Sequence, residues 1–106
     1  MIHTLFFSRF RSDMSPELLE EYNAQSADLV KRVREHFPGF VDAKKFLSED
    51  GERLTVVRFE DDEALKAWSR DPEHMDGKRR GRKDYFGEYR IVVCEEVREM
   101  KWERED

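Results

Sequence analysis

The apolar positions of the chain follow two different periods. Between residues 15 and 37, apolar or small side chains recur every three or four positions, which predicts one face of an amphipathic helix: Leu18, Leu19, Tyr22, Ser26, Leu29, Val30, Val33 and Phe37. Ser15 is suited to cap this helix and Pro16 to occupy its first position. Pro38-Gly39 predicts its end.

Other segments are short and rich in β-branched and aromatic side chains, which predicts strands: residues 2–10, 40–48, 53–60 and 84–97. Asp50-Gly51 favours a hairpin between the second and third strands, because glycine tolerates the positive φ that such turns require. A second helix is predicted to begin at Asp61 and to end before Pro72. Residues 72–80 are predicted to form a short helix or a turn.

The resulting order is β-α-β-β-α-β, which predicts an α+β protein of the ferredoxin-like type. We expect a four-stranded antiparallel sheet with both helices on one face. No linker or repeat divides the chain, so residues 1–106 are interpreted as a single domain with a charged tail at 98–106.

The predicted strands are apolar on both faces, although helices are expected to cover only one. In the first strand, Thr4 and Phe6 lie on one parity and Leu5 and Phe7 on the other. The third and fourth strands repeat this pattern. An antiparallel sheet with one exposed face would alternate apolar with polar residues. We therefore predict a homodimer in which the second face is covered by another subunit's sheet, the two sheets closing into a barrel. Trp102 is a candidate for packing the tail onto that partner.

Composition excludes several classes of protein. The 106 residues carry 25 acidic and 20 basic side chains, and the net charge of −5 argues against a nucleic-acid-binding protein. The single cysteine, Cys94, cannot form an intrachain disulfide and is expected to be a buried thiol in a reducing compartment. We find neither a signal-peptide pattern nor an apolar run of about 20 residues. We expect a soluble, cytoplasmic protein with no membrane partner.

Several short motifs follow one another in a distinctive order: Phe37-Pro38-Gly39-Phe40, Asp50-Gly51-Glu52-Arg53, Trp68, Pro72-Glu73-His74, Gly81-Arg82, Tyr85-Phe86 and Tyr89. Together they resemble the antibiotic biosynthesis monooxygenase (ABM) domain family over nearly the whole chain. The resemblance implies a dimeric α+β barrel with a pocket between the helices and the sheet of each subunit. Some members of that family oxygenate polycyclic aromatic molecules without metal or flavin, and others degrade haem.

Two residues match the family's tryptophan and histidine and are the candidate catalytic residues. Trp68 can stack on a flat ligand or donate its indole N–H; the alternative is a core anchor for the second helix. His74 can act as a general base, as a hydrogen-bond donor or as a haem ligand; the alternative is a residue that braces its turn. The haem-degrading members use an asparagine in the first strand, whereas this strand reads Leu5-Phe6-Phe7-Ser8.

The candidate substrate-binding residues are mainly aromatic: Tyr22, Tyr85, Phe86, Tyr89 and Arg58. Arg58 lies among apolar neighbours, so it either pairs with a carboxylate at the dimer interface or faces a bound anion. Four phenylalanines are expected in the core: Phe7, Phe40, Phe46 and Phe59. The basic cluster at 77–83 is either a solvated loop or an anion site. No His, Cys, Asp or Glu set has the spacing of a metal site, and none is predicted.

The leading interpretation is a cofactor-independent monooxygenase, an oxidoreductase that acts on a flat aromatic or quinone-like small molecule. In this hypothesis His74 is the base or hydrogen-bond partner, and Trp68 and Tyr85 orient the ring. Two alternatives stay open. One is a haem-binding or haem-degrading protein. The other is a dimer that binds a small molecule without turning it over.

Overall fold

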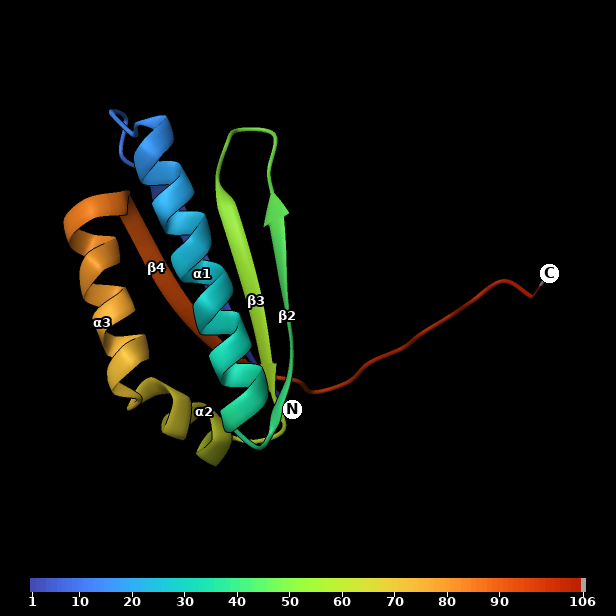
Figure 1. The fold of residues 1–106 in the computed structure, drawn as a ribbon. Helices are drawn as coiled ribbons and strands as arrows, with labels where there is room; N and C mark the ends of the chain where they lie inside the picture. The colour runs from blue at the N-terminus through green and yellow to red at the C-terminus, as the bar shows by residue number, and fades with distance from the viewer. Residues whose placement is uncertain (106) are drawn as a thin grey trace.

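The fold is a four-stranded antiparallel sheet with all its helices on one face (Figure 1). The computed structural model describes residues 1–105. Its elements are β1 (Ile2–Phe10), α1 (Pro16–His36), β2 (Phe40–Leu47), β3 (Arg53–Phe59), α2 (Asp62–Ser69), α3 (Pro72–Arg80), the π-helical turn η1 (Gly81–Tyr85) and β4 (Phe86–Glu95). The strand order is β2-β3-β1-β4, which confirms the predicted ferredoxin-like fold.

The helix boundaries follow from local capping chemistry. The Ser15 hydroxyl accepts a hydrogen bond from the Leu18 amide at 3.1 Å, and Pro16 occupies the first turn of α1. Asp61 caps α2 in the same way, accepting from the Ala64 amide at 2.9 Å. These contacts satisfy amides that a helix start would otherwise leave without a partner.

The last strand is shorter than predicted. Residues 84 and 85, expected in a strand, belong to η1, which continues directly from α3. The aromatic character of Tyr85 reflects burial beneath α1, where the residue is 1% exposed. At the other end, β4 stops at Glu95, after which the Glu96 amide donates to the Met1 carbonyl at 2.9 Å.

The two faces of the sheet have different surroundings. Register places Thr4 opposite Val57 on the face beneath the helices, where the core of Val33, Phe59 and Trp68 lies. Leu5 opposite Val56 lies on the other face, which no element of residues 1–105 covers in Figure 1. One set of alternating apolar side chains therefore belongs to the core beneath the helices, and the other set forms the uncovered face.

This division agrees with two of the expected core phenylalanines and corrects the placement of three other residues. Phe40 and Phe59 pack together under the helices, at 6.1 Å between ring centroids, as predicted for core residues. Phe7 and Phe46 are instead on the uncovered face, and Phe46 is 46% exposed. Cys94, expected to be buried, lies opposite His3 on the same face and is half-buried.

The chain after Glu96 leaves the body of the molecule as an extended tail (Figure 1). Its large apolar side chains Val97, Met100 and Trp102 are 96%, 92% and 73% exposed. The predicted tail reached residue 106, which lies outside the described residues. Within residues 1–105, no helix combines the length and the apolarity needed to cross a membrane.

We expect Gly39→Ala to destabilise the fold more than Gly51→Ala. Both glycines have φ near +90°, which an alanine adopts only with strain. A Cβ on Gly39 would also lie 2.6 Å from the Ala64 Cβ, whereas a Cβ on Gly51 would meet nothing closer than 3.9 Å. The expected losses in unfolding free energy, measured by urea denaturation, are about 3 and about 1 kcal/mol. Equal losses would contradict the close packing of Gly39 against α2.

Candidate functional site

A cavity of about 230 Å³ lies between the helical layer and the sheet. The inward-facing side chains of the sheet form its floor, and side chains from all three helices form its walls. Ile91 and Val93 of β4 line it while remaining 38% and 53% exposed, so the cavity opens to solvent beside β4. Its mainly apolar lining is typical of a site for a small organic molecule, and its volume lies just below the usual range of about 300–1,000 Å³.

Trp68 and His74 meet in the wall of this cavity. Their rings stack with centroids 4.3 Å apart and an angle of 15° between planes. The Phe37 ring also contacts the indole, edge-on at 5.0 Å between ring centroids, and Trp68 is only 7% exposed. Trp68 is therefore both a core residue and a cavity-lining residue, so the two interpretations of this tryptophan do not exclude each other.

One hydrogen bond fixes the tautomer of His74. Its Nδ1 lies 3.0 Å from the Trp68 carbonyl oxygen, and a carbonyl can only accept, so Nδ1 carries the proton. Burial lowers the pKa of the His74 imidazole to about 4, and the positive charge of Lys78 acts in the same direction. At neutral pH the ring is uncharged, and Nε2 has a lone pair that can accept a proton or a hydrogen bond.

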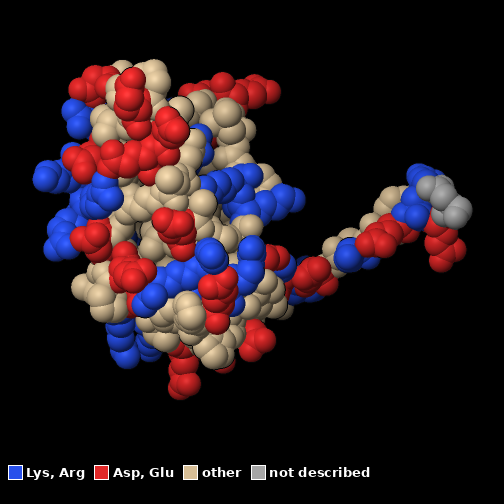
Figure 2. All heavy atoms as spheres, viewed as in Figure 1, with Lys and Arg blue, Asp and Glu red and all other residues tan. Residues whose placement is uncertain are grey.

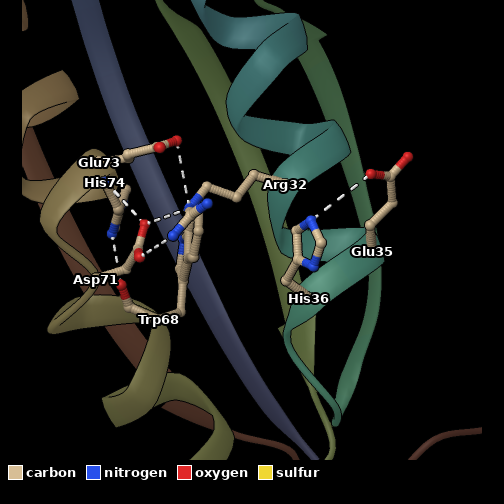
Figure 3. A network of polar contacts seen from close by, with 7 residues as sticks. All are labelled: Arg32, Glu35, His36, Trp68, Asp71, Glu73 and His74. Carbon is tan, nitrogen blue, oxygen red and sulfur yellow. Dashed lines mark hydrogen bonds and ion pairs between the residues drawn. The ribbon is translucent and has the colours of Figure 1, made fainter.

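A buried carboxylate holds the beginning of α3 in place (Figure 3). Asp71 is 5% exposed and accepts two hydrogen bonds from Arg32 of α1, at 2.9 Å from Nε and 2.7 Å from Nη2. It also accepts from the backbone amide of His74 at 3.1 Å, which makes it the N-cap of α3. The Arg32 guanidinium is the main reason why the pKa of Asp71 is lowered.

Sequence analysis did not identify Arg32 or Asp71 as part of the site. Asp71-Pro72 is a recognisable helix start, but the partner of its carboxylate is 39 residues away. Figure 3 also shows the exposed pair His36–Glu35 at the end of α1, with 3.8 Å between Nε2 and Oε2. This pair does not belong to the cavity.

Three of the five predicted substrate-binding residues line the cavity: Tyr22, Tyr85 and Phe86. Tyr22 contacts Tyr85 edge-on at 5.4 Å between ring centroids. The Tyr85 hydroxyl donates to Glu21 at 3.0 Å, so it is already engaged by the protein. Burial raises the pKa of both tyrosines, which keeps them protonated at neutral pH.

Tyr89 and Arg58 do not line the cavity. Tyr89 packs on Phe6 at 5.4 Å, and its hydroxyl accepts from Arg82 at 3.1 Å. Arg58 lies on the uncovered face of the sheet, where it donates to Asp42 at 2.7 Å from Nε and through a second contact from Nη2. This placement favours the interface alternative for Arg58 over contact with a bound ligand.

The basic side chains of residues 77–83, in α3 and η1, point to different surroundings. Arg79 pairs with Asp76 and Arg80 with Glu21, whereas Lys78 lines the cavity. In the part of the chain that the structure describes, no three His, Cys, Asp or Glu side chains come together as a metal site.

The family model for antibiotic biosynthesis monooxygenase matches residues 5–80, and the chain belongs to that family. No curated protein matches the sequence. Among solved structures, Rv0793 from Mycobacterium tuberculosis superposes with a TM-score of 0.75 at 15% identity, covering 94% of this chain and 98% of that protein.

Two further solved structures share the fold. One, from Deinococcus radiodurans, is described as a candidate antibiotic biosynthesis monooxygenase; its TM-score is 0.78 at 11% identity, covering 98% of this chain and 100% of that one. The other, from Bacteroides fragilis, is described as a dimeric protein of unknown function with a ferredoxin-like fold; its TM-score is 0.70 at 11% identity, covering 89% and 94%.

We expect His74 to make the stability of the fold pH-dependent. The pKa of His74 is about 4 in the folded protein and 6.5 in a model peptide, so between these values the unfolded chain binds more protons. His74 therefore does not lower the free energy of unfolding above pH 6.5. As the pH falls towards 4, protonation of His74 in the unfolded chain lowers this free energy by up to about 3 kcal/mol. Urea denaturation at several pH values measures this slope.

His74→Gln should flatten the slope between pH 6.5 and 4. His36→Gln is the matched control, because His36 is exposed and pairs only with its neighbour Glu35. An unchanged slope in the His74 variant would contradict a buried, neutral imidazole.

Proposed function

We propose that the chain is a cofactor-independent monooxygenase that acts on a flat phenolic or quinone-like molecule in the cavity beside Trp68 and His74. The observation that carries the proposal is the neutral His74, stacked on Trp68, with Nδ1 bound to the protein and Nε2 left as an acceptor. An acceptor of this kind, in a mainly apolar cavity, suits a ligand that combines an aromatic ring with an acidic hydroxyl.

The proposed reaction begins when a ligand hydroxyl donates its proton towards Nε2 of His74. The resulting electron-rich anion reacts with dioxygen at a ring carbon. One oxygen atom forms a new carbon–oxygen bond and becomes a carbonyl as that carbon loses its hydrogen, and the other leaves as water. Oxidation of the phenol to the quinone supplies all four electrons that reduce dioxygen, so no external reductant is needed.

The surrounding residues position this acceptor. The Trp68 carbonyl fixes the tautomer, and the indole face fixes the plane of the imidazole. Phe86 and Tyr22 line the cavity and can contact the flat faces of a ring. Tyr85 contributes its ring edge, because its hydroxyl is bound to Glu21.

A second candidate function is binding without turnover. It is favoured by the low pKa of His74, because an imidazole with a pKa of about 4 holds a proton weakly. Haem binding is a third candidate that His74 allows in principle through Nε2. Against haem degradation stands the first strand, which has no asparagine.

We further propose that the protein forms a homodimer through the uncovered face of the sheet. That face presents Leu5, Phe7, Leu54, Val56 and Val92, an apolar set that water would otherwise contact. The relative from Bacteroides fragilis, described as dimeric, supports this assembly. Trp102 on the extended tail is then available to a partner subunit. A reducing cytoplasm suits the single Cys94.

We expect His74→Gln to abolish dioxygen uptake in the presence of a polyphenolic substrate, because glutamine cannot take the proton. The measurement is an oxygen-electrode assay with a panel of hydroxylated naphthalenes. His36→Gln, exposed and outside the cavity, should retain wild-type uptake. Unchanged turnover in the His74 variant would contradict the assigned role.

The two other candidate functions predict different results. Ligand binding without dioxygen uptake in the wild type would favour a binding protein. A Soret band that appears on haem titration of the wild type and is lost in the His74 variant would favour haem binding.

We expect the wild type to have a dimeric mass by light scattering and Leu5→Glu to be monomeric, because a charge on the uncovered face opposes its burial. Leu19→Glu serves as the control, since Leu19 is an exposed leucine on α1, outside this face. A monomeric wild type in dilute solution would contradict the dimer.

A further inference from the structure

Lys78 is a cation in the cavity wall. It lies on α3, four residues after His74, so both side chains are on the same side of the helix. It lines the cavity and is half-buried. The Lys78 charge is close enough to contribute to the lowered pKa of His74.

No carboxylate neutralises Lys78. In residues 1–105, no Asp or Glu oxygen lies within 4.0 Å of its ammonium group. The acidic residues around α3 are bound to other cations: Asp71 and Glu73 to Arg32, Asp76 to Arg79, and Glu21 and Asp84 to Arg80. The positive charge of Lys78 therefore has no carboxylate partner among residues 1–105.

Two more polar groups at the cavity lack a full set of partners. The hydroxyl of Thr4, in the floor of the cavity, is buried and has no hydrogen-bond partner. On the β2 side, Lys45 donates to Ser26 of the cavity wall at 2.6 Å and has no carboxylate partner among residues 1–105. Desolvation lowers the pKa of Lys45. Thr4 and Lys78 thus line the same cavity, whereas Lys45 is exposed and contacts only its wall residue Ser26.

The cavity differs in charge from the surface around it. Figure 2 shows acidic and basic side chains intermixed over the face that carries the helices, and the chain as a whole has a net charge of −5. The cavity lining, in contrast, contains a lysine and no Asp or Glu. A binding space with one uncompensated cation and an apolar wall selects an anion with an aromatic or aliphatic body.

We propose that the cavity binds its aromatic ligand as an anion, a carboxylate or an ionised phenol, with Lys78 as the counter-charge. The Thr4 hydroxyl lies in the floor of the same cavity. This inference rests on the proposed function only in taking the cavity as the ligand site.

The test compares two ligands of the same shape, 2-naphthoate and 2-naphthamide, by isothermal titration calorimetry at neutral pH. We expect the wild type to bind the anion about tenfold more tightly, as for a charge-assisted hydrogen bond. Lys78→Gln should lose this preference by weakening 2-naphthoate about tenfold while leaving 2-naphthamide unchanged. Unchanged amide binding shows that the variant is folded. Lys83→Gln, which removes the same charge from an exposed position in η1, should behave as the wild type.

The outcomes separate this inference from the proposed oxygenase. Equal affinity of the wild type for both ligands, or an unchanged preference in Lys78→Gln, would overturn the anion site and leave the aromatic cavity standing. Failure of both ligands to bind would overturn the anion site together with the cavity. A preference for 2-naphthoate that depends on Lys78, without dioxygen uptake by any phenol, would support the anion site and contradict the oxygenase.

Discussion

The pairing of Asp71 with Arg32 is the interaction on which the site depends. A buried carboxylate is tolerated only when charged and polar partners replace the water it loses, and Asp71 has a bidentate guanidinium and a backbone amide. The same carboxylate joins α1 to α3 and begins α3. His74 follows three residues later, so its ring is brought onto Trp68 at the end of α2. One residue thus couples the position of the helices to the position of the candidate acceptor.

Burial keeps the His74 imidazole neutral and also makes it a weak base. Removing the imidazole from water keeps it neutral, so Nε2 is ready to accept a hydrogen bond at any pH above its pKa of about 4. The same desolvation makes it a weak base. Lys78 deepens that effect on His74 but has the opposite effect on a bound ligand, because a cation stabilises an ionised hydroxyl. The pair is therefore suited to accepting the proton of an acidic hydroxyl and to holding the anion that results.

The sheet separates two tasks by the parity of its strands. Side chains on one face complete the core and the cavity, and those on the other form an apolar surface that the described chain leaves uncovered. Arg58 and Asp42 lie on that second face as a pair of opposite charges. A shift of one residue in the register would move the side chains of one face to the other. The pairing of β1 with β3 therefore determines which side chains line the cavity and which form the proposed interface.

The sequence by itself determined what depends on near neighbours. The period of α1, the caps at Ser15 and Asp61 and the hairpin at Gly51 could be predicted because each needs only residues within a few positions. Trp68 and His74 were identified through the resemblance of the chain to the ABM family. Tertiary structure decided the rest. The partner of Asp71 comes from another helix, η1 interrupts a segment that has the composition of a strand, and Arg58 turns out to face away from the cavity. The charge of Lys78 matters only because the acids around α3 are already paired, and such pairing is set by distances in space that the order of residues does not encode.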